Sequence, residues 1–165
     1  MKPVIYPASQ NPKVPEATQL FRHITPIQIR FNDIDILGHI NNNAYLEYMD
    51  LGKTSYFNAI KSNLIDWKNI NVVIVNVNCN FYSPGYLKEP IAVLTTITSI
   101  SQRSLKLEQR VINTETGDVK CIGTSIMAGF DPTTAQGSEI DQQWIDAICQ
   151  YEESNIFTPT QNSQI

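Results

Sequence analysis

The sequence predicts an α+β fold in which a curved antiparallel sheet of five strands wraps around one long central helix. The chain has 165 residues, which is enough for one domain with its own core. Residues 42–60 have apolar side chains at helical spacing, whereas most of residues 72–131 alternate as strands joined by short turns. Short turns join antiparallel neighbours, and the helix and the sheet must each bury an apolar face.

The chain opens with an irregular arm, because residues 1–20 contain four prolines and show no periodicity. A strand is expected next, since three apolar residues alternate with polar ones: Ile27, Ile29 and Phe31. Residues 33–41 are expected to form a polar turn that contains Gly38.

Residues 42–60 predict the long helix. Six residues form one stripe along it: Tyr45, Tyr48, Met49, Gly52, Tyr56 and Ile60. Gly52 costs roughly 1 kcal/mol of helix propensity relative to alanine. Its place on the stripe indicates that a strand crosses the helix closely there. Residues 61–70 are expected to connect the helix to the sheet, with room for one helical turn.

Four strands are expected next, over residues 72–82, 90–101, 104–114 and 119–131. Alternating apolar residues predict the first and the third, and a composition rich in β-branched residues predicts the second. The motif "SPGY" ends the first of them, and "ETGD" forms the hairpin turn before the last. Together with the first strand, they complete the sheet of five.

A short helix is expected after Pro132, with Ser138 as its cap. Its buried face would consist of Ile140, Trp144, Ala147 and Ile148. Residues 152–165 are polar and are expected to fray. The sequence thus divides into an arm (1–20), a folded domain (21–131) and a C-terminal extension (132–165).

Composition excludes several classes of protein. The net charge of −4 provides no basic face for nucleic acid. No apolar run approaches the length of a membrane span, and the N-terminal residues do not resemble a signal peptide. Cys79, Cys121 and Cys149 are widely spaced, so a zinc or redox motif is not expected. We therefore expect a cytoplasmic protein that binds neither nucleic acid nor membrane.

The motif "FNDIDILGHINNNAYLEYMD" places Asp33 and Asp35 just before the long helix. A helix N-terminus presents unpaired N–H groups and a partial positive charge, so it can hold an anion or polarise a carbonyl oxygen. One interpretation is structural: Asn41 or Asn42 caps the helix. The other is catalytic: a carboxylate attacks or activates water while a helix N–H stabilises the oxyanion. Physical argument alone favours the cap, because caps are common.

The segment "FNDIDILGHINNNAYLEYMDLGKTSYF" resembles the hallmark of hotdog-fold acyl-CoA thioesterases of the 4-hydroxybenzoyl-CoA thioesterase type. The resemblance extends over about residues 22–131, and it selects the hotdog fold from the α+β folds that fit the pattern, cone-like folds among them. It implies that Asp35 is the catalytic base or nucleophile and that the backbone N–H of Asn42 binds the oxyanion. It also implies an assembly of dimers or tetramers, and it requires no metal or organic cofactor.

The resemblance suggests further substrate contacts. Gly38 would form a tight turn that lets the acyl group approach the backbone. His39 is interpreted mainly as a hydrogen-bonding support that could also touch substrate. Plant acyl-carrier-protein thioesterases have a functional asparagine where Leu37 stands, so their triad does not transfer. Arg103 matches the region where the family binds the nucleotide of acyl-CoA, although a solvated loop arginine is the simpler interpretation. Asp33 is expected to be a structural carboxylate.

Three alternatives remain open at this stage. A hydratase of the same fold ranks low, because "DIDILGH" lacks the asparagine and proline of that family's motif. A non-catalytic acyl-thioester-binding protein would keep the motif without turnover. A thioesterase acting on acyl-carrier protein would share the chemistry but would need a basic docking surface.

Overall fold

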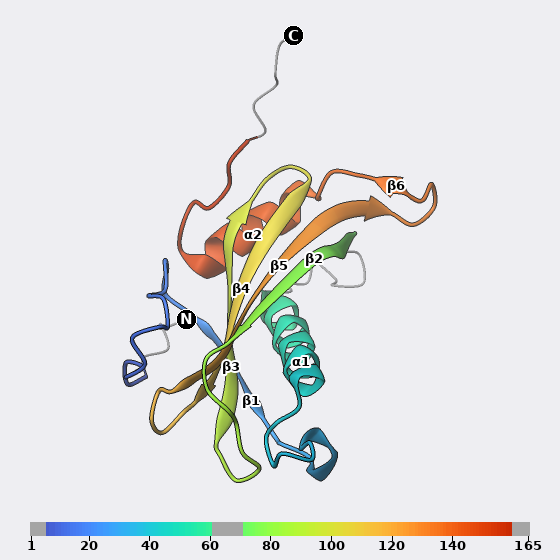
Figure 1. Cartoon of the computed structure of the whole chain (residues 1–165). Helices are drawn as coiled ribbons and strands as arrows, with labels where there is room; N and C mark the ends of the chain where they lie inside the picture. The colour runs from blue at the N-terminus through green and yellow to red at the C-terminus, as the bar shows by residue number, and fades with distance from the viewer. Residues whose placement is uncertain (1–5, 61–70, 160–165) are drawn as a thin grey trace.

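The computed structural model describes residues 6–60 and 71–159. It contains one antiparallel sheet and two α-helices, as the α+β prediction requires. Figure 1 shows helix α1 (Asn42–Ile60) lying across one face of the sheet and helix α2 (Gln142–Glu152) packed near the other end of the strands. Residues 6–20 contain no helix or strand, as expected of the arm. The expected connection over residues 61–70 lies outside the described residues.

The sheet has the strand order β1-β3-β4-β5-β2, and every pair along it is antiparallel. The strands are β1 (His23–Ile27), β2 (Val72–Phe81), β3 (Ile91–Ile100), β4 (Ser104–Asn113) and β5 (Val119–Asp131). A two-residue strand, β6 (Gln136–Gly137), pairs with β5. The four predicted strands after the helix are confirmed to within one or two residues. β1 and β2 form the two edges of the five-stranded path.

The first strand was predicted too late in the sequence. It ends at Ile27, and Phe31–Asp33 form a 3-10 turn. The Asp33 carboxylate accepts hydrogen bonds from the backbone N–H of Arg30 at 2.8 Å and from its guanidinium at 3.0 Å. These contacts bend residues 30–33 back on themselves, so the apolar alternation there cannot continue as a strand.

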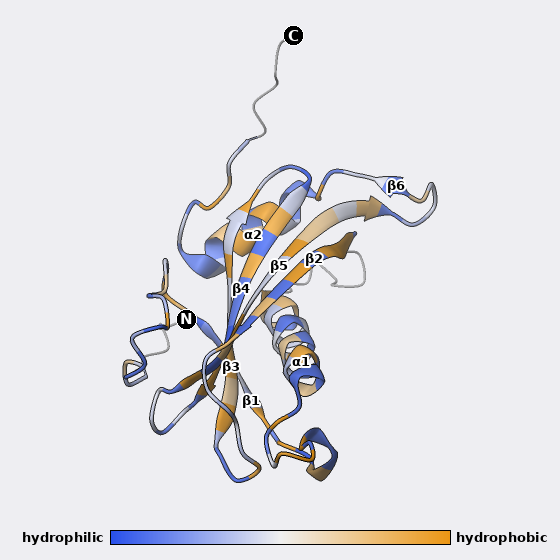
Figure 2. Ribbon diagram, in the orientation of Figure 1, coloured by the Kyte–Doolittle hydropathy of each residue, from blue (hydrophilic) through white to orange (hydrophobic). Residues whose placement is uncertain are grey.

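Helix α1 begins and ends as predicted, and all six residues of its predicted stripe are buried. Figure 2 shows that α1 carries both hydrophobic and hydrophilic residues, consistent with one buried face. A Cβ placed on Gly52 would lie 2.8 Å from Cγ1 of Val93 in β3. This confirms the close strand crossing predicted from Gly52.

Helix α2 is capped by Asp141 and not by Ser138. The Asp141 carboxylate accepts the N–H of Gln143 at 3.0 Å, while Ser138 Oγ accepts a hydrogen bond from Asn71. The predicted Ile140, Trp144 and Ile148 are buried, Ala147 is half-buried, and Ile145 is buried as well.

The expected fraying after residue 152 is wrong for the part of this segment that the structure describes. Glu152 is buried, and its Oε1 accepts the Tyr56 hydroxyl at 2.6 Å and the Ile97 N–H at 3.0 Å. Residues 156–158 pair with Ile100 of β3. Long-range contacts with the sheet hold this polar segment in place, whereas residues 160–165 lie outside the described residues.

Candidate active site

Asp33 holds the turn that precedes α1. It is 3% exposed, and it accepts hydrogen bonds from the Tyr48 hydroxyl at 2.7 Å and from Arg30, which also contacts Glu47. Burial by itself would raise the pKa of Asp33, but the hydrogen bonds from Tyr48 and Arg30 and the Arg30 charge hold this pKa below its usual range. Asp33 is therefore a structural carboxylate, as expected.

Asp35 lies in a more open position on the same turn. Its Oδ1 accepts the backbone N–H groups of Leu37 at 2.8 Å and of His39 at 3.3 Å. The turn is closed by the Asp35 N–H, which donates to the His39 carbonyl at 2.9 Å. Gly38 has φ +78°, a left-handed conformation that a side chain would strain. The hydrogen bonds to Oδ1 fix the orientation of the carboxylate, and Oδ2 receives none from the part of the chain that the structure describes.

The start of α1 resolves which asparagine caps the helix. Asn41 Oδ1 accepts the N–H of Asn43 at 2.9 Å, so Asn41 is the cap and Asn42 is the first helical residue. The Asn41 N–H donates to the Asp33 carbonyl at 2.7 Å. Within residues 6–60 and 71–159, no acceptor takes the N–H of Asn42. An unpaired donor at a helix N-terminus suits a developing negative charge.

A cleft of about 500 Å³ brings these groups together. It is lined by Asp35, Leu37, His39, Ile40, Asn41, Asn42, Tyr45 and the segment Phe81–Pro84. Sequence reasoning placed Asp35, His39 and Asn42 here. Gly38 shapes the turn but does not line the cleft.

Sequence reasoning missed the part of the cleft wall that is formed by Phe81–Pro84. This segment follows β2 and is tied to the helix-start turn, because the Ile40 N–H donates to the Gly85 carbonyl at 2.8 Å. The only local signal was the Ser-Pro-Gly break after an apolar strand, and such a break indicates a turn without indicating what lies beside it.

His39 packs edge to face against Tyr86, with ring centroids 5.3 Å apart. It lines the cleft together with Asp35, and its contact with substrate stays a prediction. Tyr45 is buried at the back of the same cleft, and burial raises the pKa of its hydroxyl.

The structure does not bring Arg103 to this cleft within one chain. Arg103 is exposed in the β3–β4 turn, and its carbonyl accepts the Gly129 N–H of β5. The cleft lies at the other end of β5, where Phe81 pairs with Cys121. Cys121 and Gly129 are eight positions apart along β5, which corresponds to about 27 Å of extended strand.

No group of three or more His, Cys, Asp or Glu side chains that could hold a metal ion occurs in residues 6–60 and 71–159. In the same part of the chain, neither helix is both long and apolar enough to cross a membrane.

Comparison with known sequences gives one family and several relatives. The model of the "Thioesterase-like superfamily" matches residues 29–148. The long-chain acyl-CoA thioesterase FadM of Escherichia coli is 26% identical over 98 residues, which cover 58% of this chain and 73% of FadM. The acyl-CoA thioester hydrolase YbgC of Escherichia coli is 24% identical over 100 residues, which cover 59% of this chain and 73% of YbgC.

Solved structures give the same fold. A thioesterase from Thermus thermophilus, solved with coenzyme A and zinc, superposes with a TM-score of 0.70 at 22% identity, covering 81% of this chain and 96% of that one. A 1,4-dihydroxy-2-naphthoyl-CoA thioesterase from Synechocystis superposes with a TM-score of 0.69 at 16% identity, covering 77% and 95%.

Proposed function

The chain belongs to the thioesterase-like superfamily, and from that premise we propose that it hydrolyses acyl-CoA thioesters to a free acid and coenzyme A. One observation carries the proposal: Asp35 and Asn42, the first residue of α1, line the same cleft. The names of FadM and YbgC support this activity and substrate class.

The proposed mechanism needs only these two groups and water. As a base, Asp35 takes a proton from water while the water oxygen bonds to the thioester carbon. The carbonyl oxygen becomes an oxyanion, and the Asn42 N–H stabilises it together with the helix dipole. The C–S bond then breaks, and the sulfur leaves as a thiolate that takes up the proton. As a nucleophile, Asp35 would attack the thioester carbon and expel the thiolate to form a mixed anhydride, which water then cleaves to the free acid and the Asp35 carboxylate, with a proton passing to the thiolate.

We assign the sheet that packs on α1 to the hotdog arrangement, with α1 as its central helix. Residues 21–131 would form its core domain, flanked by the arm and the C-terminal extension. The free cysteines Cys79, Cys121 and Cys149 support a reducing, cytoplasmic location.

We further propose that two chains pair through β2. This strand is an edge of the sheet, and its apolar residues Val73, Val75 and Val77 are all more than 40% exposed. An open apolar edge favours pairing with another strand. Phe31, Ile36 and Leu37, which lie beside Asp35 in sequence, are also strongly exposed and could be covered by the same partner.

Arg103 remains a predicted contact for the phosphate groups of coenzyme A. Because Arg103 lies at the far end of its own sheet, this contact requires a second copy of the chain. Antiparallel pairing of two β2 edges would turn the far end of one sheet toward the cleft of the other.

The first experiment compares wild type with Asp35→Asn on a panel of short, long and aromatic acyl-CoA thioesters. Asparagine keeps an oxygen that can accept the Leu37 N–H, so the turn should survive. We expect thiol release by the wild type and a loss of about 10²–10⁴-fold in the variant. Thermal unfolding of both proteins controls for stability. A wild type that releases thiol from none of these thioesters would refute the proposed activity.

A further inference from the structure

Ser83 lines the same cleft as Asp35 and has no role in the mechanism above. It is half-buried and follows β2 directly, between Tyr82 and Pro84. Its backbone is fixed to β5, because the N–H groups of Tyr82 and Ser83 point at the Lys120 carbonyl, at 2.9 and 3.5 Å. Ser83 thus lines the cleft from a segment whose backbone is hydrogen-bonded to β5.

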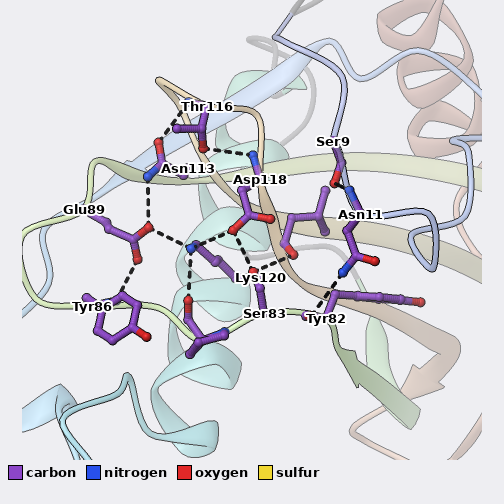
Figure 3. A network of polar contacts seen from close by, with 12 residues as sticks. Ser9, Asn11, Tyr82, Ser83, Tyr86, Glu89, Asn113, Thr116, Asp118 and Lys120 are labelled. Carbon is purple, nitrogen blue, oxygen red and sulfur yellow. Dashed lines mark hydrogen bonds and ion pairs between the residues drawn. The ribbon is translucent and has the colours of Figure 1, made fainter.

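The single proton of the Ser83 hydroxyl is already committed. Oγ donates to Asp118 Oδ2 at 2.7 Å, and the Val119 carbonyl is a second acceptor at 3.3 Å (Figure 3). A hydroxyl has one proton and two lone pairs. With its proton held by the protein, Ser83 can offer a ligand in the cleft only an acceptor.

A buried lysine fixes this orientation. Lys120 Nζ contacts Asp118 at 2.9 Å, Glu89 at 2.7 Å and the Pro84 carbonyl at 3.0 Å, so all three of its protons have acceptors (Figure 3). Burial alone would raise the pKa of Asp118, but the hydrogen bonds from Lys120 and Ser83 hold this pKa below its usual range. Asp118 is therefore a carboxylate at neutral pH and can only accept, which leaves Ser83 as the donor.

We propose that Ser83 binds substrate by accepting a hydrogen bond from an amide N–H of the pantetheine arm, the amide-containing chain that carries the thiol of an acyl thioester. This inference rests on the proposed function. An acceptor-only hydroxyl requires a donor, and the pantetheine arm carries amide N–H donors on the leaving-group side of the thioester, whereas a simple acyl chain carries none. The interaction is the same before and during hydrolysis, so it should lower KM without raising kcat.

Ser83→Ala removes the acceptor and leaves the backbone unchanged. We compare it with Ser83→Thr, which keeps the hydroxyl, and with Ser55→Ala. Ser55 is a matched control, because it is also half-buried and bonds another side chain, His23 Nε2 at 2.9 Å, and it does not line the cleft. Each protein is assayed with one acyl group on coenzyme A, on pantetheine and on ethanethiol.

For Ser83→Ala we expect KM to rise about five- to ten-fold with acyl-CoA and with acyl-pantetheine, at nearly constant kcat. With the ethanethiol ester, which has no amide, we expect the variant to match wild type. Ser83→Thr should restore most of the affinity, and Ser55→Ala should match wild type on all three substrates. An equal effect on acyl-CoA and acyl-pantetheine locates the contact on the arm itself and not on the nucleotide.

Equal losses on all three substrates, or an unchanged KM on all of them, would overturn the assignment. Calorimetric titration with free pantetheine tests it without turnover, and Ser83→Ala should weaken Kd by the same factor. If wild type binds pantetheine through Ser83 but hydrolyses nothing, the proposed function fails and the inference stands. If hydrolysis is normal but pantetheine binding does not depend on Ser83, the inference fails and the function stands.

Discussion

Asp33 and Asp35 are two residues apart, yet the fold gives their carboxylates opposite surroundings. Asp33 is buried, and its carboxylate accepts hydrogen bonds from the Tyr48 hydroxyl and from the backbone and side-chain N–H groups of Arg30. Asp35 faces the cleft with one oxygen held by the turn. A carboxylate whose oxygens already accept hydrogen bonds from the protein has a structural role. A carboxylate with one oxygen unbonded beside a helix N-terminus can react with a substrate.

Asp33→Asn is predicted to destabilise the fold by about 1–3 kcal/mol near neutral pH, because a buried hydrogen-bonded ion pair is broken. A carboxyl group whose pKa is lowered on folding stabilises the protein above its unfolded pKa, and this contribution is lost as pH falls through the lowered folded pKa. The difference between variant and wild type should therefore shrink below about pH 4. Urea unfolding from about pH 7 down to about pH 3 measures it.

Asp50→Asn is the control for this experiment. Asp50 is exposed, and within residues 6–60 and 71–159 its carboxylate pairs with Lys53, three residues further along α1. Surface pairs of this kind contribute little, so its unfolding curve should coincide with that of wild type. A difference between Asp33→Asn and wild type that did not depend on pH would contradict an ionised Asp33.

At the scale of elements, the close packing of α1 against β3 restricts which residues fit where the two cross. A Cβ at position 52 would lie too close to side-chain atoms of Val93, Gln109 and Thr95, so the packing favours glycine there. Gln109 also donates from Nε2 to the Met49 carbonyl of the helix at 2.8 Å. At this close approach a strand side chain donates a hydrogen bond directly to the helix backbone. The tight packing requires glycine at position 52, although glycine has a low helix propensity.

Gly52→Ala is predicted to destabilise the protein by about 1–3 kcal/mol, even though alanine favours helices, because interior overpacking outweighs propensity. The new Cβ would meet Val93 Cγ1 at 2.8 Å. Val93→Ala removes that atom, so Gly52→Ala should cost less in the Val93→Ala background. Denaturant unfolding of both single variants and the double variant gives the coupling. Strictly additive effects would show that the crossing is not tight at this point.

At the scale of the whole molecule, the two edges of the sheet are not equivalent. Edge strand β1 contacts α1 and the C-terminal segment through His23, which bonds Ser55 and Tyr151. Edge strand β2 leaves most of its side chains exposed on both faces. In the part of the chain that the structure describes, β1 is thus more covered than β2, and this difference supports the proposal that a second chain pairs with β2.

Val75→Lys is predicted to convert a dimer into a monomer. Val75 is 58% exposed near the middle of β2, so a lysine costs the single chain little but places a charge within the proposed interface. Light scattering after gel filtration measures the mass. Leu20→Lys, at an exposed position of the arm, should leave the dimer intact. A monomeric wild type, or a dimer that tolerates Val75→Lys, would rule out pairing through β2.

The sequence by itself determined the local elements. The helix over residues 42–60, the four strands that follow and the buried stripe through Gly52 were all predicted, because hydrophobic periodicity and turn residues act over a few neighbouring positions. The motif around Asp35 was readable for the same reason, since a turn and a helix start are local structures. The first strand was misplaced where a side chain, Asp33, bends its own backbone.

Only the tertiary structure decided which distant residues meet. Three features depend on strand register and long-range packing: the cleft wall of Phe81–Pro84, the hydrogen bond from the Ser83 hydroxyl to Asp118, and the attachment of Glu152 to the sheet. The separation of Arg103 from the cleft is likewise set by the length and direction of β5. Local patterns contain no information about contacts between residues that are far apart in sequence, because those contacts form when the whole sheet closes over α1 and buries its face.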